Sequence, residues 1–171
     1  MILKELKIVT PIGEPTNCYI VFDENSKEAM VIDPAGEIEK ITEMLDILKA
    51  NLKYIYITHC HGDHIGGVKR LQTEKNGKIL IHRLDAPGLN DPAISLVEHI
   101  GVESTYIDVD SILDNEDLLH VGNIEFKVIH TPGHTCGGSS LYCEKENLNP
   151  RIDESNLENE YTRNKIRNIV I

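Results

Sequence analysis

The first third of the chain alternates short apolar segments with turn residues, a pattern typical of β-strands. The stretches LKELKIV (residues 3–9) and NCYIVFD (17–23) alternate apolar and polar positions in part. The next stretch, EAMVIDPAG (28–36), runs from apolar residues into an Asp-Pro turn. We therefore predict three strands in this region, each followed by a turn.

A single amphipathic helix is predicted over residues 37–52. Its apolar residues recur at spacings of three and four, which places them on one helical face. They are Ile38, Ile41, Leu45, Leu48 and Leu52. The segment KYIYIT (53–58) is β-branched and aromatic, as buried strands are. This predicted strand ends directly before a group of histidines.

The pattern after the histidines predicts another helix, on the spacing of Ile65, Val68 and Leu71, that stops at KNGK. A strand, KILIH (78–82), follows it, and the turn-rich segment 83–95 is a predicted surface loop. Segments 118–121 and 124–131 are apolar and flank a Gly-Asn pair, which favours a β-hairpin. Strands and helices followed by a hairpin indicate a layered α/β (α+β) domain.

Composition and charge restrict the class of protein. A chain of 171 residues is long enough for one domain with a substantial core. The net charge of -11 opposes non-specific binding to nucleic acid or to an anionic membrane. The N-terminus lacks the pattern of a signal peptide, and the four cysteines form no C-x-x-C pair. We expect a soluble, cytoplasmic protein with reduced thiols.

The composition changes near residue 146. Residues 147–171 contain six asparagines and show no apolar periodicity before the final IVI. Four basic and four acidic residues balance there, so the net charge of -11 belongs to residues 1–146. We therefore predict a domain over residues 1–146 and an unrelated C-terminal tail over residues 147–171.

The stretch THCHGDHIGG (58–67) is the strongest chemical signal in the chain. His59, His61, Asp63 and His64 lie within six residues, and Zn²⁺ favours such nitrogen and oxygen donors. Two imidazoles at i and i+2 can converge on one ion, whereas Asp63 and His64 would face a neighbouring position. The spacing indicates room for two metals. The glycines also fit a purely structural role in tight turns and close packing.

A further candidate ligand lies in HTPGHTCGGSSLY (130–142). His134 follows a Pro-Gly turn after a predicted strand, where a side chain can face a shared cleft. A third imidazole would complete a three-histidine set of the kind that lowers the pKa of a metal-bound water. Four other histidines are expected to be ordinary surface or core residues, namely His82, His99, His120 and His130.

THCHGDHIGG resembles the T-H-x-H-x-D-H signature of the metallo-β-lactamase superfamily. HTPGHTCGGSSLY resembles the third-ligand motif of its glyoxalase II-like branch. The early segment TNCYIVFDENSKEAMVIDPAG is similar to the opening hairpin of that branch, with Ala35 where glycine is usual. The three motifs occur in the family's order and cover about residues 2–143.

The resemblance implies an αββα fold and a metal-dependent hydrolase of a small thioester or ester. His59, His61 and His134 would hold the first metal, and Asp63 and His64 would help to hold the second. A metal-bound hydroxide would attack the carbonyl, with Asp63 orienting it and transferring protons. Asp33 would play a supporting role. Zinc, as one or two ions, is the expected cofactor, although iron and manganese use the same donors.

The C-terminal part departs from the family. The family continues with a Gly-Asp turn whose aspartate bridges both metals and with a last histidine, and neither follows Tyr142 here. We therefore expect an incomplete C-terminal half. The alternative function is a metal-binding protein with impaired catalysis.

The tail, about residues 148–171, resembles a segment of tRNA(Ile)-lysidine synthetases without their nucleotide-binding loop. We expect that two unrelated coding fragments are joined near residue 147. An RNA-binding function would rest on this tail alone, and the charge of -11 disfavours it.

Overall fold

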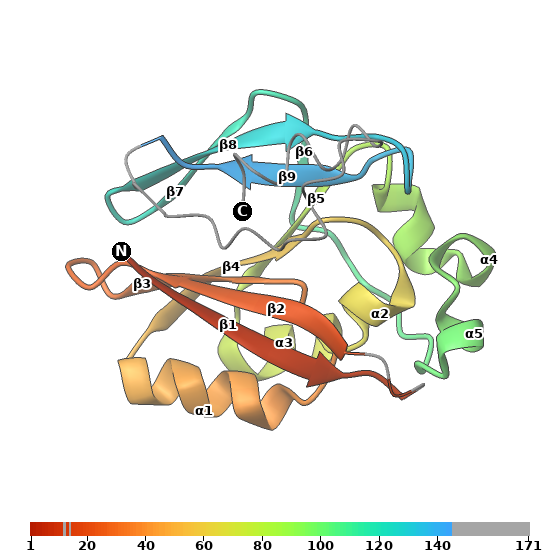
Figure 1. Cartoon of the computed structure of the whole chain (residues 1–171), viewed down its shortest axis with the longest axis horizontal. Helices are drawn as coiled ribbons and strands as arrows, with labels where there is room; N and C mark the ends of the chain where they lie inside the picture. Colours follow the sequence, from red (N-terminus) through yellow and green to blue (C-terminus); the bar gives the residue numbers. More distant parts are fainter. Residues whose placement is uncertain (12, 14, 145–171) are drawn as a thin grey trace, which may run out of the picture.

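The computed structural model describes residues 1–11, 13 and 15–144. Two β-sheets lie face to face in it (Figure 1). The larger has six strands in the order of the sequence: β1 (Ile2–Val9), β2 (Pro15–Phe22), β3 (Glu28–Ile32), β4 (Asn51–Ile57), β5 (Lys78–His82) and β6 (Ser111–Leu113). The smaller contains β7 (Leu118–Val121), β8 (Ile124–His130) and β9 (Ser139–Tyr142).

The parallel strands β3 to β6 all end at the same edge of the larger sheet. Strands β1 to β3 are antiparallel, whereas β3 to β6 run parallel. Parallel neighbours need crossover connections. Helix α1 (Ile38–Leu48) links β3 to β4, and α2 (Gly62–Ile65) and α3 (Val68–Lys75) link β4 to β5. The short helices η1 (Ala86–Asn90), α4 (Pro92–Ser95) and α5 (Val97–Ile100) lie between β5 and β6.

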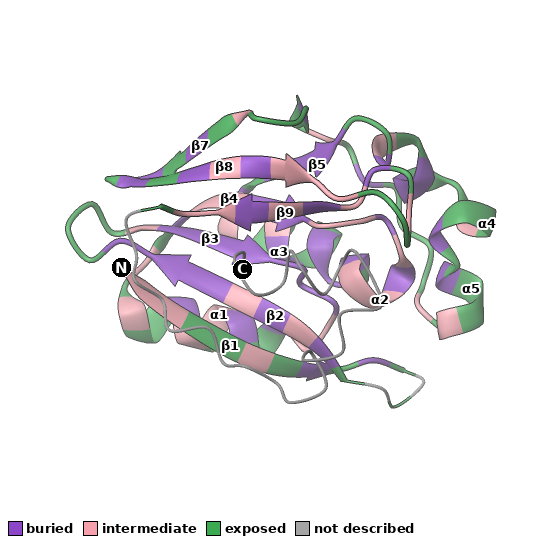
Figure 2. Ribbon diagram, turned by 45° about the horizontal axis from the view of Figure 1, so that its top comes forward, coloured by how far each residue is buried: buried purple, intermediate pink, exposed green. Residues whose placement is uncertain are grey.

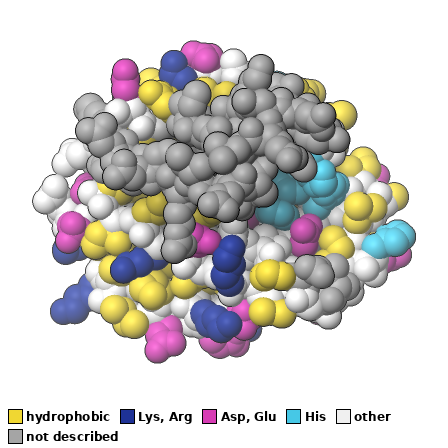
Figure 3. Space-filling view, in the orientation of Figure 1, with side chains coloured by type: hydrophobic (Ala, Val, Ile, Leu, Met, Phe, Trp, Pro, Cys, Tyr) yellow, Lys and Arg dark blue, Asp and Glu magenta, His cyan; other side chains and the backbone are white. Residues whose placement is uncertain are grey.

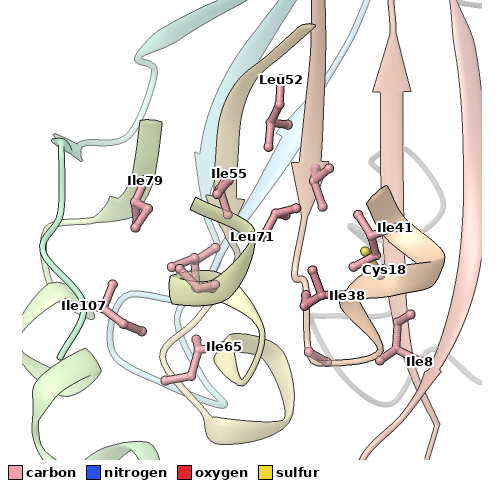
Figure 4. Packing of buried hydrophobic residues seen from close by; sticks show 14 of the residues in the cluster. Ile8, Cys18, Ile38, Ile41, Leu52, Ile55, Ile65, Leu71, Ile79 and Ile107 are labelled. Carbon is pink, nitrogen blue, oxygen red and sulfur yellow. The ribbon is translucent and has the colours of Figure 1, made fainter. Parts of the chain in front are cut away.

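The central strands of the six-stranded sheet, β3 to β5, are largely buried on both faces, and their residues alternate between two cores. Val31, Ile55 and Ile57 belong to the core formed with α1 and α3. Figure 4 shows Ile55 in this core with Ile38 and Ile41 of α1 and Leu71 of α3. Met30 and Tyr56 point the other way, into the core between the sheets. Figure 2 shows the resulting buried positions along the strands. Helices, six-stranded sheet and three-stranded sheet thus form three layers, which confirms the predicted sandwich for this part of the chain.

Every strand predicted from the pattern is present, but some helix boundaries differ. The predicted helix 37–52 ends at Leu48, because Lys49 adopts a left-handed conformation (φ 53°), and Leu52 lies in β4. The predicted loop 83–95 contains η1 and α4 instead. The Asp91 carboxylate caps α4 by accepting a hydrogen bond from Ala93 N at 3.0 Å.

No helix within the described residues is both long and apolar enough to cross a membrane. The predicted boundary at residue 147 and the tail with its tRNA(Ile)-lysidine synthetase resemblance lie outside the described residues. They stay predictions.

The two sheets are joined by a buried hydrogen bond, which gives a direct test of their packing. The Tyr56 hydroxyl lies 2.7 Å from the Ser139 hydroxyl, and Tyr56 is fully buried. We expect Tyr56→Phe to lower the free energy of unfolding by about 0.5–1.5 kcal/mol, measured by urea denaturation. The matched control is Tyr106→Phe, because Tyr106 is 72% exposed. Equal stability of the two variants would contradict this role.

Candidate metal centre

Two histidine-bearing loops meet at the carboxyl ends of the parallel strands. The first histidine loop, residues 58–64, begins directly after β4 and includes the first three residues of α2. The second histidine loop, residues 131–138, connects β8 to β9 of the other sheet. Ser139 N donates a hydrogen bond to Thr58 O at 3.0 Å, so the start of the first loop lies beside the end of the second. Segments far apart in the sequence therefore share one site.

Three imidazoles from these loops converge. His59, His61 and His134 each offer a ligand atom, and these atoms all lie within 4.8 Å of one another. His61 Nδ1 and His134 Nε2 are 2.9 Å apart. That separation is near the edge of a tetrahedron built on Zn–N bonds of about 2.0–2.1 Å, which is ~3.3 Å. The three residues predicted to hold the first metal thus lie together.

A second group lies beside the first and shares one residue with it. His59, Asp63 and His64 also place one ligand atom each within 4.8 Å of the others. Asp63 and His64 belong to the single turn of α2, and His61 is its N-cap residue. The sequence predicts two separate sets of ligands, whereas in the structure His59 belongs to both groups.

The His59 ring provides an independent test of whether these residues fit a metal. Its Nδ1 lies 3.1 Å from Thr58 Oγ1. Its Nε2 is buried, and among the described residues it has no hydrogen-bond partner. Buried polar atoms are nearly always paired, and an unpaired one needs an explanation. A metal ion would supply the missing partner, so the donor set fits a metal.

The electrostatics of the site keep two of its imidazoles neutral. Burial, followed by the proximity of His64, lowers the pKa of His59 to about 4. Burial and the neighbouring His134 lower the pKa of His61 as well. A neutral imidazole is the form that binds metals. Both rings are therefore ready to act as ligands near neutral pH.

Asp33 organises the second group. It follows β3, is buried, and adopts a left-handed backbone conformation (φ 52°). Its carboxylate accepts hydrogen bonds from Thr58 N (2.8 Å) and Thr58 Oγ1 (2.7 Å), and its Oδ2 lies 2.8 Å from His64 Nδ1. Burial disfavours a charged His64, but the charge and hydrogen bond of Asp33 outweigh it and raise the pKa of His64. The Nε2 of His64 is left facing Asp63, 3.6 Å away.

The remaining histidines lie outside the two groups. His82 is buried and stacks on His130 with ring centroids 4.2 Å apart. His99 and His120 are exposed, and His120 pairs with Glu125 at 3.0 Å. These four are core or surface residues, as expected. Figure 3 shows one cluster of histidine side chains on this face of the molecule and a separate histidine at the right edge of the view.

The glycines of the motif also have a structural role, in close packing. Gly67 N donates to Pro34 O at 2.7 Å. A Cβ on Gly67 would come within 2.6 Å of that oxygen and would also clash with Ile38. The motif therefore needs glycine here for packing of α3 against the start of α1. This role and the metal site coexist.

Comparison with known proteins identifies the family. Residues 11–148 match the family model of the metallo-beta-lactamase superfamily. The chain belongs to the metallo-beta-lactamase superfamily. Its similarity to hydroxyacylglutathione hydrolases places it in the glyoxalase II-like branch. The resemblance inferred from the three motifs is confirmed.

Among curated relatives, a hydroxyacylglutathione hydrolase of Pelagibacter ubique is 31% identical, over 75% of this chain and 46% of its own length. A probable polyketide biosynthesis zinc-dependent hydrolase, PksB of Bacillus subtilis, is 31% identical, over 74% of this chain and 50% of its length. The crystal structure of the BLEG-1 B3 metallo-beta-lactamase has a TM-score of 0.74 and 32% identity, covering 84% of this chain and 68% of that one. The chain spans about half the length of these two curated relatives.

The Asp33–His64 pair predicts a measurable change in titration. Asp33→Asn removes the negative charge that favours the imidazolium, so we expect the pKa of His64 to fall below its usual value of about 6.5. The measurement is an NMR titration of the metal-free protein. Asp46→Asn, an exposed carboxylate paired with Lys75, serves as the control and should leave His64 unchanged. An unaltered pKa in the Asp33 variant would argue against the assignment.

Proposed function

We propose that this chain is a metal-dependent hydrolase that cleaves a small thioester or ester. The observation that carries the proposal is the convergence of His59, His61 and His134 around the unpaired, buried Nε2 of His59. Such a set of three imidazoles leaves one position of a tetrahedral ion for water or substrate. The membership of a superfamily with zinc-dependent hydrolases supports the same conclusion.

The residues divide into those that would hold metal and those that support them. His59, His61 and His134 would hold the first ion, and Asp63 and His64 would contribute to a second. Zinc bound there would supply Lewis-acid chemistry and activate water as a nucleophile. Thr58 lies against the His59 ring, and Asp33 against His64, so each would fix the orientation of its ligand.

Asp63 is the residue that we assign to catalysis. Its side chain is 35% accessible, so it can contact substrate and water. It lies in the first turn of α2. From there its carboxylate would orient the attacking water and accept its proton, and would return a proton to the leaving thiolate or alkoxide.

The substrate class rests on the relatives. The Pelagibacter relative is named for hydrolysis of hydroxyacylglutathione, and the Bacillus relative for a hydrolase of polyketide biosynthesis. We propose a small-molecule thioester for this chain on that basis. His134 is exposed, so the first group can be reached from solvent. A cytoplasmic location and the absence of nucleic-acid and membrane partners stay predictions.

One observation favours the second candidate, a metal-binding protein with impaired catalysis. The second group has only His59, Asp63 and His64 among the described residues, with His59 shared with the first group. Metal content distinguishes the candidates: one zinc per chain without turnover supports the second candidate, and two with turnover supports the first.

The proposal predicts a specific loss of activity. With S-lactoylglutathione as the probe thioester and a zinc-loaded protein, Asp63→Asn should lower kcat at least ~100-fold, because a positioned general base contributes about 10²–10⁴. Zinc at the first group should be retained, as measured by mass spectrometry of the metal content.

The matched control is Asp108→Asn, an exposed carboxylate outside the site, which should turn over the probe as the wild type does. Wild-type levels of hydrolysis by the Asp63 variant would refute its assigned role.

A further inference from the structure

Asp85 is a buried carboxylate that touches both histidine loops although it belongs to neither. It lies three residues after the end of β5, whose carboxyl end is next to that of β4. It is the N-cap residue of η1. An aspartate at the start of a helix usually caps it. The Asp85 side chain makes no such bond to η1. Its carboxylate oxygens instead accept hydrogen bonds from the two histidine loops.

The Asp85 carboxylate accepts three hydrogen bonds. Oδ2 accepts from Cys60 N, between His59 and His61, at 3.1 Å. The same oxygen accepts from Thr135 Oγ1 at 2.7 Å, and Oδ1 accepts from Gly137 N at 2.6 Å. One side chain thus holds the main chain of the first histidine loop and both a side chain and the main chain of the second.

The contact with the second histidine loop is close enough to require glycine. A Cβ on Gly137 would lie 2.8 Å from Asp85 Oδ1 and 2.9 Å from Asp85 Cβ. Real Cβ atoms do not approach that closely. The second histidine loop therefore packs in direct contact with Asp85, so a shift of the carboxylate would shift the loop.

We propose that Asp85 is a positioning residue, which sets the separation of the two histidine loops and thereby the zinc affinity of the His59, His61 and His134 group. This inference rests on the proposed function, since it requires a metal at that group. Ligand geometry decides affinity, and supporting partners of metal ligands typically contribute about 10–100-fold. Asp85 acts one step further out, through the backbone that carries the ligands.

Asp85→Asn is the informative substitution, because it preserves shape and removes acceptor capacity. An amide has one oxygen and one NH₂ group, which only donates. In either orientation the NH₂ faces a backbone N–H, that of Cys60 or that of Gly137. At least one loop then loses its acceptor.

The chain offers a matched control in Asp23. It is also buried and also links the two sheets, accepting from Ser26 Oγ at 2.9 Å and from Asn123 N at 3.1 Å. It follows β2, next to the start of β3, and so lies at the opposite end of the sheet from the histidine loops. Asp23→Asn removes comparable bonds far from the metal group.

The experiment measures zinc affinity by competition with a chelator, and stability by urea unfolding in EDTA. We expect Asp85→Asn to weaken zinc binding about tenfold or more. Asp23→Asn should lose metal-free stability yet bind zinc as the wild type does. Equal zinc affinity of Asp85→Asn and wild type would overturn the proposal, as would weakened binding in both variants in proportion to lost stability.

A second pair of variants covers the case in which Asp85→Asn does not fold. Thr135→Val removes a single bond to Asp85 and should weaken zinc binding, whereas Thr135→Ser keeps the hydroxyl and should bind as the wild type does. Identical affinities of these two variants would overturn the proposal. A wild-type chain that takes up no zinc would overturn the proposed function, and this inference with it.

Discussion

The hydrogen bond from Ser139 N to Thr58 O is the constraint on which the site depends, because it joins the two sheets where the first histidine loop begins and the second ends. His59 and His61 are carried by the six-stranded sheet and His134 by the three-stranded one. No arrangement within either sheet alone would bring the three imidazoles together. The site is consequently a property of sheet packing, which the buried Tyr56–Ser139 contact reinforces.

Two carboxylates divide the support of the site between them. Asp33 accepts from Thr58 and lies against His64, so it acts on the group formed within the first histidine loop. Asp85 accepts from Cys60 and Gly137, so it acts across both loops. Asp33 directly follows β3 and Asp85 lies three residues after β5, so both are near the carboxyl ends of parallel strands of the larger sheet. The carboxyl edge of that sheet thus supplies four of the five candidate ligands, all but His134, together with the two carboxylates that support the site.

Much of this arrangement could be predicted from the sequence, because its signals are local. Alternating apolar residues predict the strands, and the close spacing of three histidines and an aspartate in residues 59–64 predicts a metal site. The end of α1 could not be predicted, since Lys49 ends the helix in a left-handed conformation without a glycine or proline to mark it. Asp85 has the appearance of a turn residue. Its donors are mostly main-chain groups, 25 and 52 residues away, which leave no trace in the sequence.

The two candidate metal groups differ in how much of the chain must fold before they exist. The group of His59, Asp63 and His64 is contained in one loop, which is supported by Asp33 at the end of β3. The other group closes a loop of 73 residues between His61 and His134. Closing this loop costs chain entropy, and the packing of the two sheets offsets that cost. A metal at the three-histidine group therefore stabilises only conformations in which the two sheets are packed together.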